Sequence, residues 1–313
     1  MVATNAGAEP DTGQDPIRAG YALRTRKGDP LDERAALAWC ERYAKRQYEN
    51  FTVVSWLMPK RRRASMYGLY AFCRFTDDLG DKAGGDRLAL LDEWERDLER
   101  AFVEEGRHPI MVALGEIARR HPLSIDSCRR LIEANRRDQR QTRYETFQDV
   151  LEYCDYSANP VGQMVLSLFD HTDEERVALS DATCTALQLA NHWQDVSRDY
   201  AMGRLYLPLD DLRRFRVSEA QIAERLCDEN FRALMRFEVD RAEALFLRGK
   251  GLVSLVDPDL QLDLELFTAG GLAVLRAIEA QHYNVLARRP TISNWQKGRL
   301  AMGVAARHWI GGR

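Results

Sequence analysis

Three aspartates close the segment YAFCRFTDDLGD, which runs from residue 70 to residue 81. Asp77 and Asp81 stand four residues apart with Asp78 between them, so a helix would hold the three carboxylates close together. Like charges at this spacing destabilise a helix. The surrounding residues do not supply enough positive charge to pair all three, so we expect the cluster either to face bulk water or to hold a cation.

A second acidic cluster lies in QLANHWQDVSRDY, which begins at residue 188. Asp195 and Asp199 again stand four residues apart, on one face of a helix. Polar side chains extend the stripe of each cluster toward the helix N-terminus: Asn191 and Gln188 in the second cluster, Arg74 and Tyr70 in the first.

Two such stripes facing each other across a cavity would repel and take up protons, unless divalent cations lay between them. Mg²⁺ prefers oxygen ligands and is commonly held by a few carboxylates together with water and the phosphates of a substrate. Arg74 and Tyr70 can donate hydrogen bonds to phosphate oxygens. A lone DDxxD motif is more often a solvated helix end, but the pair favours a magnesium site for a diphosphate. We expect more than one Mg²⁺ ion, because the two clusters together offer five carboxylates. The predicted metal ligands are Asp77, Asp78, Asp81, Asn191, Asp195 and Asp199.

The elements that must position these stripes are helices. Apolar residues recur at steps of three and four with charges opposite, for example over 86–102, 173–201 and 228–250, and strand alternation is nearly absent. Prolines fall between the periodic segments. We therefore predict one all-α domain from residue 31 to 313, preceded by a loose tail over residues 1–30 that is rich in Gly, Asp, Thr and Pro.

Composition excludes several classes of protein. The 313 residues are 45% hydrophobic and 30% charged, which is typical of a globular protein, and a net charge of −3 gives no argument for nucleic acid as a partner. The six cysteines form no CxxC pair and predict reduced thiols in a cytoplasmic protein. The sequence shows neither a secretory signal nor an apolar run long enough to span a membrane. The aromatic and basic C-terminal segment would suit peripheral contact with a bilayer, and a solvated terminal helix is the alternative.

Three motifs together carry a resemblance to a known family. YAFCRFTDDLGD, the pair Tyr153 and Cys154, and QLANHWQDVSRDYAMGRLYLP resemble the squalene and phytoene synthase family over about residues 40 to 290. Within it, ENFTVVSWLMP (49–59), YCDYSANPVG (153–162) and NHWQD (191–195) look most like the bacterial hydroxysqualene synthases of hopanoid biosynthesis. The resemblance implies an isoprenoid synthase fold, with helices around a central active-site cavity.

The resemblance also implies roles for the matching residues. Those that it assigns to catalysis are Tyr153, near the reacting carbons, and the four aspartates Asp77, Asp81, Asp195 and Asp199, which bind Mg²⁺ and diphosphate with Asp78 as a helper. Those that it assigns to substrate binding are Phe51, Tyr70, Arg74, Gln188, Asn191 and Arg204. We interpret Trp193 as a core residue.

One position departs from the family pattern, and the histidines receive no role in it. Gln194 stands where many members carry an arginine, so we expect one weaker phosphate contact. No histidine has metal-ligand spacing, and we assign none a catalytic role. His192 is expected to point to a different face from Asn191.

The activity that the resemblance implies is conversion of presqualene diphosphate and water to hydroxysqualene and diphosphate, which makes the protein a lyase of isoprenoid biosynthesis. It would need Mg²⁺ and no nicotinamide cofactor. One alternative is a head-to-head transferase of the squalene, dehydrosqualene or phytoene type that condenses two prenyl diphosphates. Another is a non-catalytic binding or assembly module, against which the intact aspartates argue. Neighbouring enzymes of the same pathway are left open as partners.

Overall fold

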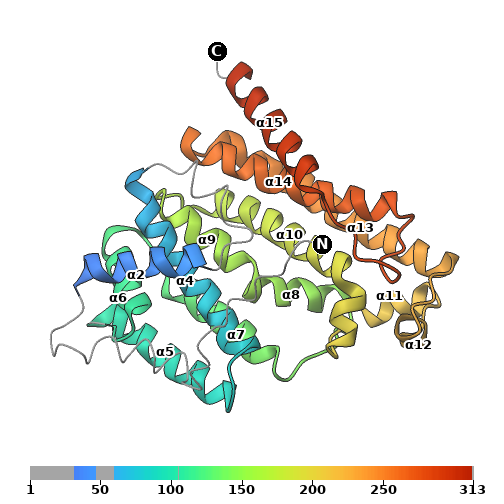
Figure 1. The fold of residues 1–313 in the computed structure, drawn as a ribbon, viewed down its shortest axis with the longest axis horizontal. Helices are drawn as coiled ribbons and strands as arrows, with labels where there is room; N and C mark the ends of the chain where they lie inside the picture. The colour runs from blue at the N-terminus through green and yellow to red at the C-terminus, as the bar shows by residue number, and fades with distance from the viewer. Residues whose placement is uncertain (1–31, 47–59, 105, 312–313) are drawn as a thin grey trace, which may run out of the picture.

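A computed structural model describes residues 32–46, 60–104 and 106–311 of the chain (Figure 1). Every regular element in these ranges is a helix, as the periodicity predicted. The elements are α2 (Glu33–Arg46), α4 (Lys60–Asp81), α5 (Arg87–Val103), α6 (Pro109–Arg120), α7 (Ile125–Arg137), α8 (Phe147–Ser157), α9 (Asn159–Ser167), α10 (Glu174–Ala201), α11 (Leu209–Arg214), α12 (Glu219–Ala223), α13 (Glu229–Gly249), the 3₁₀ helix η1 (Lys250–Leu255), α14 (Pro258–Ala280) and α15 (Asn294–Gly311).

Local signals in the sequence set the ends of the long helices. Asp173 caps α10 by accepting a hydrogen bond from the Arg176 backbone N–H, and Asp228 caps α13 in the same way through the N–H of Phe231. Such a cap stabilises a helix by about 1 kcal/mol. Pro109 begins α6, where its missing N–H costs no hydrogen bond. These are the boundaries that the sequence predicted.

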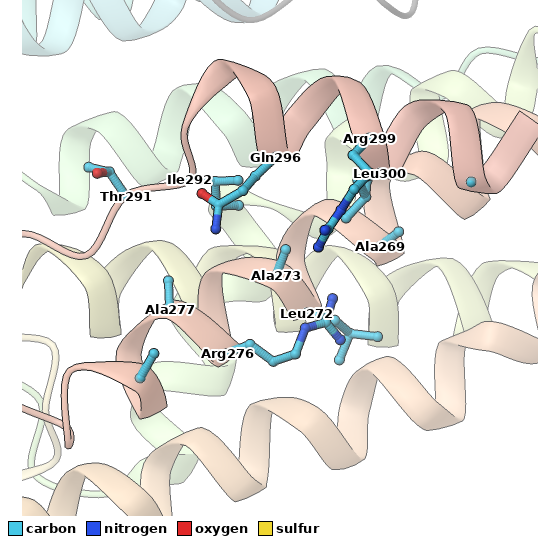
Figure 2. A pocket seen from close by; sticks show the side chains of 12 residues that line it. Ala269, Leu272, Ala273, Arg276, Ala277, Thr291, Ile292, Gln296, Arg299 and Leu300 are labelled. Carbon is cyan, nitrogen blue, oxygen red and sulfur yellow. The ribbon is translucent and has the colours of Figure 1, made fainter.

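The C-terminal helix α15 packs against α14 and extends beyond the rest of the structure (Figure 1). The two helices enclose a cavity of about 500 Å³ (Figure 2). Arg276 of α14 and Arg299 of α15 line this cavity together with alanines and leucines. Neither arginine makes an ion pair with a described carboxylate.

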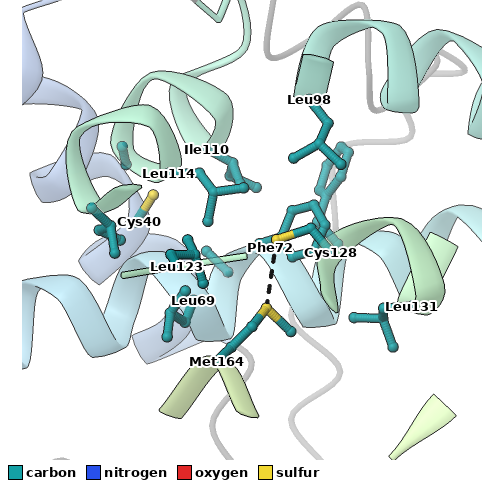
Figure 3. Close-up of a cluster of buried hydrophobic side chains, with 14 of the residues drawn as sticks. Cys40, Leu69, Phe72, Leu98, Ile110, Leu114, Leu123, Cys128, Leu131 and Met164 are labelled. Carbon is teal, nitrogen blue, oxygen red and sulfur yellow. Dashed lines mark hydrogen bonds between the residues drawn. The ribbon is translucent and has the colours of Figure 1, made fainter. Parts of the chain in front are cut away.

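Two clusters of buried side chains form the core. The first lies around α4 to α7 and α9, and includes Phe72 and the Cys128–Met164 sulfur contact of 3.7 Å (Figure 3). The second lies around α10 and α13. Trp193 belongs to the second cluster, is fully buried, and donates from Nε1 to the Glu238 carbonyl at 3.0 Å, so its assignment to the core is confirmed.

Helices α10 and α14 contribute to both clusters. Leu260 of α14 belongs to the first and Leu275 to the second, while α10 packs Leu179 against the first and Leu189 inside the second. This continuity is what one domain requires, and the predicted tail over residues 1–30 lies outside the described residues. All six cysteines are free. In the described part of the chain no helix is long and apolar enough to cross a membrane.

Candidate active site

The last turns of α4 carry the first acidic cluster, and its three carboxylates have different surroundings. Asp78 turns toward α2, where it accepts from the Tyr43 hydroxyl at 3.0 Å and pairs with Arg74 at 2.9 Å and Lys82 at 3.0 Å. Asp77 accepts only an amide hydrogen bond from Asn135, at 3.3 Å, among the described residues. Burial raises the pKa of Asp77 to about 7. Asp78 is thus already paired, whereas Asp77 forms no ion pair with a described residue.

The same contrast recurs on α10. Asp195 forms a two-pronged ion pair with Arg289, at 2.5 and 2.8 Å, and lies 3.4 Å from Arg198. Asp199 forms no hydrogen bond or ion pair with a lysine or arginine of the described residues, and the His192 ring nitrogen Nδ1 lies 4.0 Å from its carboxylate. Burial and the neighbouring charge of Asp195 raise the pKa of Asp199 to about 7. Each acidic helix therefore offers one carboxylate without a cationic partner.

Arg204 brings the two acidic clusters together. Its Nη2 lies 3.2 Å from Asp81 of α4, and its backbone N–H donates to the Asp199 carbonyl of α10 at 2.8 Å. The chain can make this turn because Gly203, at φ +86°, adopts a left-handed conformation just after α10 ends. The two stripes therefore converge on one region.

The polar residues that precede Asp195 remain available. Gln188 is half-buried and Asn191 is exposed, and neither makes a hydrogen bond to a described residue. Tyr70 lies two helical turns before Asp77, where it lines an apolar cavity. Phe51 lies outside the described residues, so its predicted contact with substrate stays a prediction.

An aromatic wall flanks the aspartates. Tyr153 donates its hydroxyl to Asp138 at 3.0 Å, and its ring lies 5.5 Å from that of Tyr206. The His192 ring stacks on Tyr206, with centroids 3.6 Å apart. As expected, His192 points to a different face of α10 from Asn191, which is exposed, whereas His192 is buried. The turn at Gly203 folds residues 204–208 over this buried face, so His192 joins the aromatic wall. Burial lowers the pKa of His192 to about 3, so this ring is a neutral part of the wall.

A cavity of about 300 Å³ opens between α4, α9, α10 and α14. Its walls are mainly leucine, methionine, valine and phenylalanine side chains, and Tyr70 and Cys73 place one side of it directly before the first acidic cluster. This arrangement agrees with helices around a central cavity. It puts an apolar chamber next to carboxylates, which suits a substrate with a lipid chain and a charged head.

The carboxylates do not form a ready-made metal site. Among the described residues, no group of three or more His, Cys, Asp or Glu side chains is arranged to hold a metal ion. The donors nevertheless fit Mg²⁺, which usually takes only a few carboxylates and fills its other positions with water and substrate phosphate. Asp77 and Asp199 are the strongest candidates for metal ligands, because burying a carboxylate that lacks an ion pair costs free energy unless something neutralises its charge.

Several residues at this site escaped the sequence reasoning. Arg289 hydrogen-bonds Gln194 at 2.9 Å as well as Asp195, so a cation does stand beside position 194, supplied from the segment after α14. Asp138, whose pKa burial raises to about 6, and Tyr206 join the aromatic wall. Arg289 is separated from Asp195 by 94 positions, so no local spacing could have found it.

Comparisons with known proteins identify the family of this chain. The family model for squalene/phytoene synthase matches residues 44–296. The chain is 32% identical over 272 residues to 15-cis-phytoene synthase of Synechococcus elongatus, covering 82% of this chain and 88% of the relative.

Two solved structures extend the comparison. Squalene synthase HpnC from Alicyclobacillus acidocaldarius superposes with a TM-score of 0.79 at 48% identity, covering 82% of this chain and 97% of that one. A dehydrosqualene synthase in complex with ligand superposes with a TM-score of 0.81 at 28% identity, covering 90% and 98%. The chain belongs to the squalene/phytoene synthase family.

Proposed function

We propose that the protein is a magnesium-dependent enzyme that converts presqualene diphosphate and water to hydroxysqualene and diphosphate. The observation that supports the reaction class is that Arg204 connects the two acidic clusters, through Asp81 of α4 and the Asp199 backbone of α10. Asp77 and Asp199 form no ion pair with a described lysine or arginine, and an apolar cavity lies next to the first cluster. The 48% identity to the protein titled squalene synthase HpnC supports the finer assignment.

The aspartates and Asn191 would hold Mg²⁺, with Asp78 contributing only after release from Arg74 and Lys82. The bound ion would act as a Lewis acid that neutralises charge on the leaving diphosphate. Arg204 lies between the clusters, where its guanidinium can donate to diphosphate oxygens in place of Asp81. Arg74 and Tyr70, which precede Asp77 on α4, would contact the diphosphate from that side.

The carbon chemistry follows from loss of diphosphate. The C–O bond breaks with its electron pair on the leaving group, the cyclopropane opens by rearrangement, and a water oxygen bonds to the final cation and gives up a proton. The faces of Tyr153 and Tyr206 can stabilise positive charge. The apolar cavity would shield the cation from unwanted water.

A second candidate is condensation of two prenyl diphosphates. It is favoured by the 32% identity to a phytoene synthase over most of both chains. The same aspartates would serve this reaction, so the site geometry alone does not separate the two products.

Product identification tests the proposal. The purified protein is incubated with Mg²⁺ in H₂¹⁸O, separately with presqualene, farnesyl and geranylgeranyl diphosphate. The lipid products are identified by mass spectrometry. We expect ¹⁸O-labelled hydroxysqualene from presqualene diphosphate, its loss with EDTA and in Asp77→Asn, and normal yield in the exposed control Asp259→Asn. A hydrocarbon formed from two prenyl diphosphates would replace this function with the second candidate. Folded protein that releases no diphosphate from any of them would leave only the binding module.

We further propose peripheral contact with the inner face of the cytoplasmic membrane, where the water-insoluble product must go. Trp295 and Met302 of α15 are 71% and 69% exposed and stand seven residues apart, on one helix face. Lys297 is exposed nearby, and Arg276 and Arg299 line the adjacent cavity. Exposed aromatic, apolar and basic side chains on one helix are typical of bilayer-surface contact.

A further inference from the structure

The cavity beside the aspartates contains one side chain that does not fit an apolar wall. Asp263 of α14 is 1% exposed and lines this cavity, and neither of its carboxylate oxygens has a hydrogen-bond partner among the described residues. Burial alone raises its pKa to about 7. A buried carboxylate without a partner destabilises a protein, and nothing in the packing of α14 requires one at this position.

No described cation compensates for Asp263 within the cavity, because no lysine, arginine or histidine is among the lining residues. The other titratable lining groups are Tyr70, Cys73 and Cys184, and burial raises the pKa of all three, so they are neutral. Buried polar groups without protein partners normally bind water. We therefore expect Asp263 to hold water at its end of the cavity.

Contacts along α14 locate that end. Asp259 pairs with Arg61 near the start of α4, and a Cβ at Gly271 would lie 3.0 Å from Leu187 of α10. Past the end of α14, Arg289 reaches Asp195. Helices α14 and α10 therefore run in the same direction, with the aspartates of α10 toward their C-terminal ends. Asp263 precedes Gly271 by eight residues, so it lies at the end of the cavity far from the aspartates.

The length of α10 between the cavity and the aspartates indicates how long a prenyl chain the cavity can hold. Ser180 also lines the cavity and precedes Asp195 by fifteen residues, which is about 22 Å at the helical rise of about 1.5 Å per residue. One more isoprene unit adds four main-chain bonds, or about 5 Å, to an extended chain that advances about 1.2 Å per bond. A longer prenyl chain would therefore press on the far end, where Asp263 lies.

We propose that Asp263 sets the length of prenyl chain that the cavity accepts, by giving an apolar chamber a polar end. The inference rests on the proposed function in one respect, namely that this cavity holds a prenyl chain. A chain built from fifteen-carbon units would stop short of the carboxyl group and its water. A twenty-carbon chain would displace the water and leave the carboxyl oxygens against hydrocarbon, which is unfavourable.

Binding and turnover with chains of two lengths test the inference. Farnesyl and geranylgeranyl thiodiphosphates, which do not ionise readily, are titrated by calorimetry in the presence of Mg²⁺ into the wild type, Asp263→Ala, Asp263→Leu and Asp263→Asn. Diphosphate release is then measured with presqualene diphosphate and with its homologue built from two twenty-carbon chains. The control is Asp259→Ala, one turn earlier on the same helix and facing solvent.

We expect the wild type and Asp259→Ala to favour the fifteen-carbon ligand. Asp263→Ala should raise relative affinity and relative kcat/KM for the twenty-carbon compounds at least tenfold. Asp263→Asn keeps a polar side chain at the end of the cavity and should keep the wild-type preference. Asp263→Leu should bind the shorter chain with wild-type affinity. The melting temperatures of all three variants should be no lower than that of the wild type.

The two proposals fail in different ways. An unchanged length preference in folded Asp263→Ala would overturn the role of Asp263 while leaving the enzymatic activity in place. Tight, length-selective binding without turnover would refute the proposed reaction and retain the role of Asp263. Equal wild-type affinity for both chain lengths would overturn the inference whatever the reaction.

Discussion

Replacing Asp77 with asparagine should stabilise the metal-free protein at neutral and alkaline pH. Asparagine has nearly the same shape as aspartate and can keep the contact with Asn135, but it carries no charge to be buried. The pKa of Asp77 is about 7 in the folded chain against an ordinary value of 3.8. The native protein therefore binds this proton more tightly than the unfolded chain does.

The sign and size of the effect follow from that difference. The contribution of Asp77 to the free energy of unfolding is fully present below about pH 4 and is lost as the pH rises through about 7. At about 1.4 kcal/mol per pKa unit, the full loss would be about 4 kcal/mol. Because Asp77 is only half-buried and water screens part of the charge, we expect a gain of about 1–3 kcal/mol for Asp77→Asn at pH 8.

Thermal melting followed by circular dichroism in EDTA, from pH 4 to pH 8.5, measures this gain. A chain of this size should melt roughly 2–5 °C higher as Asp77→Asn at pH 8, with the difference from the wild type closing near pH 4. The matched control is Asp195→Asn, which breaks the ion pair with Arg289 and should not raise the melting temperature. An equal gain in both variants, or a gain that does not depend on pH, would refute the reasoning.

Three further predictions concern other parts of the molecule. Arg204→Gln should lower kcat/KM for diphosphate release at least tenfold in steady-state assays, with part of the activity kept in Arg204→Lys, because a charge-assisted hydrogen bond contributes about 1.5–3 kcal/mol. Gly271→Ala should lower the free energy of unfolding by about 1–3 kcal/mol in urea titrations, because the added Cβ would lie 2.1 Å from Phe246 Cζ. The control Gly270→Ala, whose Cβ would meet nothing within 4 Å, should leave the free energy of unfolding unchanged or raise it. Trp295→Ser should reduce flotation with phosphatidylglycerol vesicles severalfold, and equal flotation of both proteins would count against the bilayer contact.

The helices and the acidic stripes could be predicted from sequence because their signals are local. A cap such as Asp173 and the apolar period of α10 lie within one segment, and the spacing of Asp195 and Asp199 fixes their shared face whatever surrounds them. The all-helical fold follows from the same kind of signal, since each helix buries its own apolar stripe.

Residues that act through tertiary packing could not be found in this way. Arg289 reaches Asp195 only because the segment after α14 returns to α10. Asp263 lies in LQLDLELF, which contains two carboxylates, and either of them could face solvent on an amphipathic helix. Only the packing of α14 on α4, α9 and α10 places Asp263 at the cavity. The stacking of His192 on Tyr206 could not be predicted for a similar reason, because it depends on the loop after α10 folding back over that helix.

The distribution of charge at the site explains how it can form without metal. Five cationic side chains pair with only three of the five aspartates: Arg74 and Lys82 with Asp78, Arg198 and Arg289 with Asp195, and Arg204 with Asp81. The site therefore contains as many cationic side chains as aspartates, but they are unevenly distributed. Asp77 and Asp199 are the two aspartates left without an ion pair to a described lysine or arginine. Those two carboxylates are the ones for which a divalent cation would relieve the largest cost of burial. Arg204 and Arg289 meanwhile pair with Asp81 and Asp195. If a metal bound these carboxylates, as proposed, the two guanidinium groups would become free to donate hydrogen bonds to a diphosphate.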